Sequence, residues 1–343
     1  MNQSPAPLNR RLSVAPMMEW TTRDFRFLLR LITRHTLLYT EMVHARAVIH
    51  GDRERLLGFS PQEHPLALQL GGSEPQALAE AARIAADLGY DEINLNVGCP
   101  SERVQSGAFG ACLMAEPQLV ARCVDAMCSA VAIPVTVKTR IGIDDRDDYQ
   151  FLLQLVRPVR DAGCSSFAIH ARKAILSGLS PKENREIPPL DYGRAYQLKQ
   201  DFPELEIIVN GGVTSLAEAL THLEHVDGVM IGREAYQNPW HLAEADALLF
   251  GTTPPARSRL DVLAAFHGYV VDRYRQGHHP RHALRHVLSL VQGVPGARAF
   301  RRHLSENMHH PDATPALLEQ AIACLDHQRL ASTTGTDECY EQA

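Results

Sequence analysis

The stretch EINLNVGCPSERVQS, residues Glu92–Ser106, connects the fold of this chain to its chemistry. Its first half, Glu92–Val97, has the length and apolar content of a buried strand and runs directly into Gly98, Cys99 and Pro100. In barrels and sheets of parallel strands, reactive groups lie just beyond the carboxyl ends of the strands. A cysteine has a free pKa of about 8.5, so a thiol at this place can act as a nucleophile or a proton donor. An arbitrary cysteine is more often a small buried hydrophobe, but the strand-end position favours the reactive role.

Seven further apolar runs of strand length surround this one, separated by stretches with helical periodicity. Together the eight runs are Leu12–Ala15, Leu37–Thr40, Leu66–Leu70, Glu92–Val97, Pro134–Thr139, Ser166–His170, Ile207–Asn210 and Gly228–Ile231. Continuous apolar runs are typical of parallel strands buried on both faces. Ser73 and Gln76 have the spacing of a capping box that begins a helix, and Ser215 and Glu218 repeat that spacing. Because no GxGxxG follows the first run, the pattern favours a (β/α)8 TIM barrel over a doubly wound sheet.

The composition changes after Phe250. Residues 251–258, GTTPPARS, are rich in threonine and proline and predict a linker after a barrel domain at residues 1–250. Apolar residues at helical spacing over 259–330, including Leu263, Phe266, Val270 and Tyr274, predict a smaller all-α domain. Residues 331–343 are polar, and we expect a disordered tail there.

Composition limits the class of protein. The 343 residues are 45% hydrophobic and 22% charged, which is typical of a globular protein. No apolar run approaches the roughly 18 residues that span a bilayer, and the N-terminus lacks a signal peptide, so we expect a cytoplasmic protein without a membrane contact. The seven cysteines include no CxxC pair, which argues against a disulfide framework and a zinc site; we expect no metal.

The formal net charge of −6 is unevenly distributed. Residues 256–310 contain nine arginines, no lysine and three acidic residues. A local arginine surplus in an otherwise acidic protein indicates contact with a polyanion, because the guanidinium fork matches phosphate. An ordinary solvated helical surface explains the charge about equally well.

Most of the predicted strands end in polar or glycine residues. Gly211-Gly212 and Gly232-Arg233 follow the last two, where glycines let backbone N–H groups approach a phosphate. Arg233 could add a bidentate contact. At the fifth strand end, Lys138 offers a cation for an electron-rich ring, and at the third Gln69 offers a donor and an acceptor for the edge of a heterocycle. A planar ring with a phosphate tail fits this set, and we expect FMN.

Several long strings resemble those of the bacterial tRNA-dihydrouridine synthases, their subfamily A above all. They are SVAPM, LQLGG, NLNVGCPS, VKTRIG, IHARKAILSGLSPKENREIPPLDY, NGGV and IGREAYQNP, and they cover about residues 10–310 in the same order. The resemblance implies a flavin-binding barrel and a helical tRNA-binding domain. It also implies reduction of uridine to 5,6-dihydrouridine at positions 20 and 20a of the tRNA D-loop, with NADPH as the reductant of FMN, by a monomer. Met18-Glu19 stands where relatives often have Leu-Asp.

The resemblance further implies roles for single residues. Cys99 matches the general acid, which donates a proton to C5 of uracil while hydride passes from N5 of reduced FMN to C6. The implied cofactor contacts are Ala15, Pro16, Met17, Gln69, Lys138, His170, Asn210, Gly211, Gly212, Gly232 and Arg233. The implied tRNA contacts are Asn96, Lys182, Arg185, Arg298 and Arg301. Lys182 and Arg185 belong to a polar insertion after the sixth strand, and they either touch RNA or only order that loop.

Two other functions stay open. Another FMN barrel reductase, acting on a free small molecule such as dihydroorotate, would explain the barrel but not the arginine-rich C-terminal region. A non-catalytic tRNA-binding protein would explain that region but leaves Cys99 and the cofactor residues without a purpose.

Overall fold

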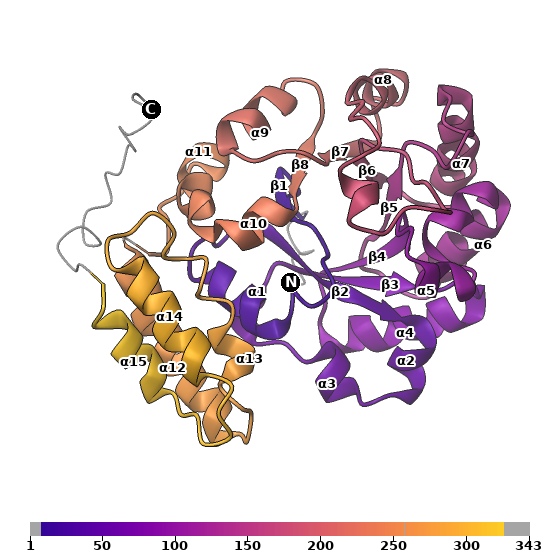
Figure 1. Cartoon of the computed structure of the whole chain (residues 1–343). Helices are drawn as coiled ribbons and strands as arrows, with labels where there is room; N and C mark the ends of the chain where they lie inside the picture. Colours follow the sequence, from indigo (N-terminus) through magenta and orange to yellow (C-terminus); the bar gives the residue numbers. More distant parts are fainter. Residues whose placement is uncertain (1–7, 257, 326–343) are drawn as a thin grey trace, which may run out of the picture. The chain divides into compact units, whose positions relative to one another are not determined.

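Eight parallel strands close into a barrel in the order β1 to β8, each paired with its neighbours in the chain and β8 with β1 (Figure 1). The computed structural model describes residues 8–256 and 258–325. The strands are β1 (Leu12–Val14), β2 (Leu37–His44), β3 (Leu66–Gly71), β4 (Glu92–Val97), β5 (Val135–Arg140), β6 (Ser166–His170), β7 (Glu206–Asn210) and β8 (Gly228–Ile231). The predicted TIM barrel is therefore confirmed.

Helices follow the strands of the barrel and cover them with apolar faces. They are α2 (Ala45–His50), α3 (Arg53–Leu57), α4 (Pro75–Leu88), α5 (Glu102–Ser106), α6 (Pro117–Cys128), α7 (Tyr149–Asp161), α8 (Gly193–Asp201) and α9 (Leu216–His222). Ser215 caps α9 as predicted, because its hydroxyl accepts the N–H of Glu218 at 3.1 Å. The capping box predicted from Ser73 and Gln76 is wrong, since α4 begins one residue later, after Glu74, and no side chain caps it.

The barrel interior is apolar in one sector and polar in another. Ala15, Leu37, Ala67, Ala168, Ile208 and Met230 form part of one buried apolar cluster. Along β4, in contrast, Glu92, Asn94 and Asn96 alternate with apolar residues, and all six residues of the strand are buried. The expectation of a continuous apolar run is therefore wrong for β4. Its polar side chains share one face of the strand, because successive side chains point to opposite faces.

Contacts between residues divide the chain into two units. Of the described residues, the first unit comprises 8–23 and 35–232, and the second comprises 24–34, 233–256 and 258–325. The helices of the second unit are most of α1 (Arg23–Arg30), α10 (Arg233–Gln237), α11 (Ala245–Phe250), α12 (Arg259–Arg275), α13 (Arg281–Leu284), α14 (Ala297–Asn307) and α15 (Ala316–Ile322).

The division between the two units falls at Gly232, so α10 and α11 belong to the second unit, and the expected end of the barrel domain at residue 250 stays a prediction. A physical reason is that Asp246 of α11 accepts hydrogen bonds from the Thr33 hydroxyl at 2.6 Å and the Arg34 N–H at 2.7 Å. The expected limits of the helical domain, residues 259 and 330, stay predictions, and the tail at 331–343 lies outside the described residues.

Within α12, the expected core positions Leu263, Phe266 and Val270 are buried. Tyr274 is 44% exposed, so the apolar face of this helix ends before its last turn. Across the part of the chain that the structure describes, no helix is long and apolar enough to cross a membrane.

Candidate active site at the carboxyl ends of the strands

The loop after β4 holds Cys99 in a fixed backbone position. The side-chain oxygen of Asn96 accepts the N–H of Gly98 at 3.1 Å and that of Cys99 at 2.9 Å. The Cys99 carbonyl accepts the N–H of Ala111 at 2.9 Å. Cys99 is half-buried, and its Sγ lies 3.7 Å from the hydroxyl oxygen of Ser101. Cys99 is therefore anchored through its backbone, while the residue as a whole is not fully buried.

Arg140, the last residue of β5, joins this loop to two other segments. Its Nε donates to the Gly98 carbonyl at 3.0 Å, and its Nη1 donates to the carbonyls of Lys173 at 2.9 Å and Asn184 at 3.0 Å. Only 3% of Arg140 is exposed. Burial, together with the charges of Arg185 and Arg172, lowers the pKa of Arg140 to about 10, and the nearby Cys99 opposes that shift. The guanidinium is thus still charged at neutral pH and sets the spacing between the loop after β4 and the loop after β6.

Lys138 and His170 also lie at the barrel mouth. Lys138 stands beside Asn96 in the β4–β5 register, and its ammonium makes no hydrogen bond or ion pair with any described residue. Burial and then the charge of Arg140 lower the pKa of Lys138 to about 7. Burial and the charges of Arg140 and Lys138 hold the pKa of His170 well below 6.5, so its imidazole is neutral.

A glycine turn follows β7 beside the His170 ring. Gly211 and Gly212 have φ angles of 111° and 76°, which disfavour any residue with a side chain. A Cβ on Gly211 would also lie 2.7 Å from Cδ2 of His170. The Tyr192 hydroxyl donates to the Gly211 carbonyl at 2.7 Å. This turn therefore exposes backbone where a side chain could not fit.

The ends of β7, β8 and β1 lie next to one another around the barrel. The side-chain amide of Asn210 donates to the Met230 carbonyl at 2.7 Å, which ties β7 to β8. At Gly232, a Cβ would meet nothing nearer than the Cβ of Ala15, at 3.9 Å. Ala15 is buried, and Pro16 and Met17 beside it are half-buried. Arg233 is the first residue of α10.

Comparison with known proteins identifies the family. A family model for dihydrouridine synthase (Dus) matches residues 13–326. The chain belongs to the dihydrouridine synthase family. It is 60% identical over 321 residues to the tRNA-dihydrouridine(20/20a) synthase of Vibrio cholerae serotype O1, covering 93% of this chain and 98% of that protein. It is 58% identical over 320 residues to the enzyme of the same name from Escherichia coli strain K12, covering 93% and 92%.

A solved structure shares the barrel fold. The complex of 2-naphthoyl-CoA reductase with 2-naphthoyl-CoA superposes with a TM-score of 0.53 at 10% sequence identity, covering 68% of this chain and 49% of that one. This likeness concerns the fold alone.

In this dihydrouridine synthase family member, both polar atoms of the Gln69 side chain already form hydrogen bonds within the protein. It is 1% exposed, its amide nitrogen donates to the Asn94 side-chain oxygen at 2.8 Å, and its oxygen accepts from the Asn96 amide at 2.8 Å. An amide carries two N–H groups, so Gln69 and Asn96 each retain one donor for a ligand. The Asn96 oxygen already accepts two N–H groups, so Asn96 is a donor rather than an acceptor toward any ligand.

The polar insertion after β6 is ordered from within. Buried Asn184 donates to the Ile175 carbonyl at 2.9 Å and accepts the Ile175 N–H at 2.7 Å. Lys182 is exposed and Arg185 is half-buried. Arg185 lies close enough to add to the lowering of the pKa of His170. The predicted residues Lys182 and Arg185 therefore belong to a loop that Arg140 fixes to the barrel mouth.

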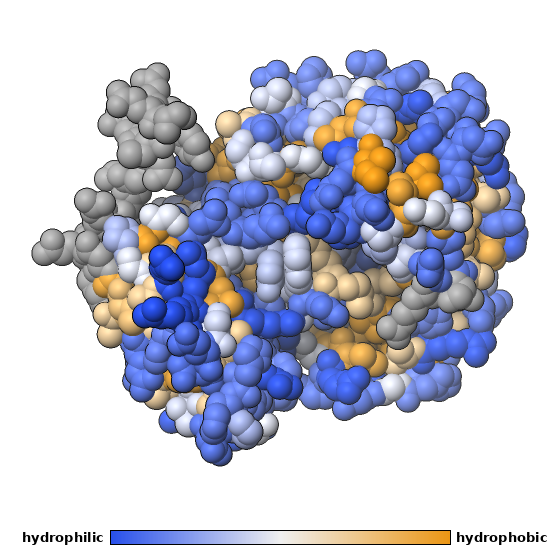
Figure 2. Space-filling model, in the orientation of Figure 1, coloured by the Kyte–Doolittle hydropathy of each residue, from blue (hydrophilic) through white to orange (hydrophobic). Residues whose placement is uncertain are grey.

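Arg298 and Arg301 lie on α14, whose other face buries Ala297, Phe300 and Leu304. Both arginines are exposed, and neither makes a hydrogen bond or ion pair with a described residue. Arg302 is exposed beside them, and sequence reasoning did not single it out. Strongly hydrophilic side chains gather over this helix (Figure 2).

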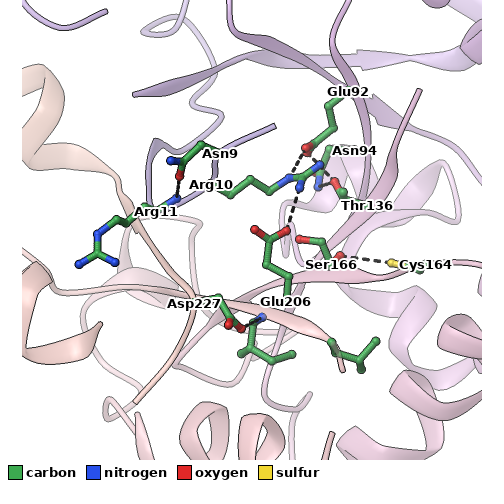
Figure 3. A network of polar contacts seen from close by, with 12 residues as sticks. Asn9, Arg10, Arg11, Glu92, Asn94, Thr136, Cys164, Ser166, Glu206 and Asp227 are labelled. Atoms are coloured by element: carbon green, nitrogen blue, oxygen red, sulfur yellow. Dashed lines mark hydrogen bonds and ion pairs between the residues drawn. The ribbon is translucent and has the colours of Figure 1, made fainter. Parts of the chain in front are cut away.

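Sequence reasoning also missed a buried polar network inside the barrel (Figure 3). Arg10 donates to Glu92 at 2.6 Å and to Glu206 at 2.8 Å. Glu92 also accepts from the hydroxyls of Tyr39 and Thr136, each at 2.6 Å. Burial opposes the charge of Arg10, but the two carboxylates outweigh it and raise the pKa of the guanidinium. The alternation of polar residues in EINLNV is the signal that could have revealed this network.

Proposed function

We propose that this protein is a flavin-dependent tRNA-dihydrouridine(20/20a) synthase, which reduces the C5–C6 double bond of uridines 20 and 20a in the tRNA D-loop. The observation that carries the proposal is the half-buried Cys99, held at the end of β4 in a chain of this family. Relatives that are 57–60% identical over most of their length carry this name.

The strand ends fit a phosphorylated flavin, and we assign FMN. The side-chain-free turn at Gly211 and Gly212 suits a phosphate, which backbone N–H groups can approach. The half-buried ammonium of Lys138, with no hydrogen-bond acceptor among the described residues, suits the electron-rich part of the ring. The other proposed contacts are Ala15, Pro16, Met17, Gln69, His170, Asn210, Gly232 and Arg233. Reduced flavin, when bound, supplies the hydride for C6 of uracil, and NADPH is its proposed reductant.

The residues of this chain supply the proton and the geometry. Cys99 donates a proton from its thiol to C5, opposite the side on which hydride arrives. The remaining amide N–H of Asn96 can donate to a carbonyl oxygen of the base. The charged guanidinium of Arg140 keeps positive charge near the mouth, where negative charge develops on the base, and the imidazole of His170 stays neutral.

The tRNA would be held through its phosphates by Arg298 and Arg301 and beside the pocket by Lys182 and Arg185. The target uridine has to leave the folded tRNA to reach a barrel mouth, and a loop base costs less to turn out than a base in a stem. This physical argument supports a D-loop target.

The test is a side-by-side assay of the purified protein with NADPH or NADH. Unmodified tRNA, free uridine and dihydroorotate are offered separately, and dihydrouridine is located in the tRNA by mass spectrometry. We expect the purified protein to show a flavin absorption band. Of the three compounds offered, it should reduce only tRNA, at positions 20 and 20a. Equal turnover of a free small molecule would overturn the choice of substrate. Dihydrouridine at 16 or 17 would overturn the choice of position.

A further inference from the structure

A chain of hydrogen bonds runs along the polar sector of the barrel interior toward the loop after β4. The Thr136 hydroxyl donates to Glu92 at 2.6 Å, and the Asn94 amide donates to the Thr136 oxygen at 2.9 Å. The Gln69 amide donates to the Asn94 oxygen, and the Asn96 amide donates to the Gln69 oxygen, each at 2.8 Å. Each of the five side chains is no more than 8% exposed.

This chain of hydrogen bonds has a single direction. An ionised carboxylate only accepts hydrogen bonds, so the hydroxyl of Thr136 has to donate to Glu92 and is left to accept from Asn94. The orientation of the Asn94 amide then sets that of Gln69, and Gln69 sets that of Asn96. Every side-chain donor therefore points toward Glu92, and Arg10 pairs with that carboxylate at 2.6 Å.

At the end of the chain farthest from Glu92, the direction of the hydrogen bonds fixes the amide of Asn96 and with it the loop after β4. Because the amide nitrogen of Asn96 faces Gln69, its oxygen faces the backbone N–H groups of Gly98 and Cys99. A reversed amide would place N–H against N–H and release this loop. A reversed Gln69 would present a different atom to a ligand. The position of Cys99 thus depends on a carboxylate four hydrogen bonds away from Asn96, at Glu92.

We propose that Glu92, Asn94 and Thr136 are positioning residues for the reaction at Cys99, because they fix the amide orientations of Gln69 and Asn96. The inference rests on the proposed function for its substrate, but its structural part concerns this chain alone. A displacement of reacting groups by about 1 Å can cost roughly 10²-fold in rate, so loss of the orientation should slow turnover while tRNA binding is retained.

Thr136→Val is the first test, since it keeps the side-chain volume and removes the hydroxyl that joins Asn94 to Glu92. Thr136→Ser restores the hydroxyl. Ser13→Ala is the matched control, because Ser13 is a buried residue of β1 whose hydroxyl lies 3.5 Å from the Val229 carbonyl, outside the hydrogen-bond chain. We expect Thr136→Val to slow the reoxidation of reduced flavin by tRNA about 10- to 100-fold, with an unchanged KM for tRNA. Thr136→Ser and Ser13→Ala should behave as the wild type.

A second readout does not depend on activity. The rate at which iodoacetamide alkylates Cys99 is measured at several pH values by peptide mass spectrometry, in the absence of tRNA. This rate depends on the surroundings of the thiol. We expect Thr136→Val to change the rate and its pH profile, and Thr136→Ser to restore both. If the wild type makes no dihydrouridine yet the alkylation profile shifts in this way, the proposed function fails and the positioning role stands.

An unchanged alkylation profile and unchanged reoxidation in folded Thr136→Val would overturn the inference. If that variant does not fold by circular dichroism, Glu92→Gln carries the same test. A glutamine keeps the shape and lets the hydrogen bonds run in either direction, while Glu206 still pairs with Arg10 at 2.8 Å. Wild-type alkylation in folded Glu92→Gln would equally overturn the positioning role.

Discussion

The basic side chains of the barrel mouth and those of α14 are held in opposite ways. Arg140 is 3% exposed and donates to three backbone carbonyls, whereas Arg298 and Arg301 are exposed and bond to no described residue. Burial lowers the pKa of Arg140 to about 10 and that of Lys138 to about 7.

This contrast separates two uses of positive charge. A buried cation costs desolvation free energy, and Arg140 is held in one geometry by its three hydrogen bonds. Exposed arginines cost little to place and act on a polyanion through released counterions, with little need for exact geometry. On the proposed function, the mouth orients the reacting groups and α14 attracts the tRNA phosphates. Variants at the mouth should change the reaction, and variants on α14 should change binding.

The largest effect is expected for Cys99→Ala. General acid catalysis typically contributes about 10²–10⁴-fold, so single-turnover reoxidation of reduced flavin by tRNA should slow by that factor. Flavin content and tRNA affinity should stay normal, because the loop is held by backbone bonds that alanine retains. Cys112→Ala is the matched control, as Cys112 is another half-buried cysteine in the segment after α5. Near-normal reoxidation in Cys99→Ala would remove the assignment of the proton donor.

A smaller, binding-only effect is expected when Arg298 and Arg301 are both replaced by alanine. The apparent KM for tRNA should rise, and the slope of log affinity against log salt should flatten by about 1 for each phosphate that the variant no longer neutralises. Flavin content should not change. Arg275→Ala is the control, since Arg275 is exposed on α12 but pairs with Asp272 at 3.3 Å. Loss of flavin in the double variant would assign α14 a structural role instead.

The fold was predictable because its signal is repeated eight times along the chain. Three strands, β4, β6 and β8, have the predicted bounds. The largest difference is β2, which continues to His44, beyond the predicted end at Thr40. Its pairing with β3 shifts register between Tyr39 and Met42, and such an irregularity depends on the neighbouring strand and leaves no local pattern.

The site was only partly predictable from the sequence. The position of Cys99 and Lys138 near the carboxyl ends of strands could be predicted because the end of a strand is visible in the sequence, and their roles stay predictions. The anchor at Glu92 could not be found in this way, because its partners Arg10 and Thr136 lie 82 and 44 residues away. The polar alternation in β4 shows that something occupies the interior, but only the closed barrel shows which groups meet. Gln69 was expected to offer a donor and an acceptor to a ligand. In the structure, its amide nitrogen donates one hydrogen bond to Asn94, and its oxygen accepts one from Asn96.

The smallest expected effect concerns stability and tests whether Lys138 is held at a cost. Its pKa falls from 10.5 to about 7 in the folded protein, so between these values the unfolded chain binds more protons and stability rises with pH. Below about 7 the cost of burying the ammonium is complete, and above 10.5 it vanishes. Lys138→Met should therefore raise the Tm of the flavin-free protein at acidic pH, with the gain shrinking as the pH rises toward 10.5, and should weaken flavin binding. Lys182→Met, at an exposed position, should leave the Tm unchanged at every pH. A Tm gain for Lys138→Met that does not vary with pH would come from added apolar packing. The charge of Lys138 would then cost no free energy of folding, as is expected for the exposed arginines of α14.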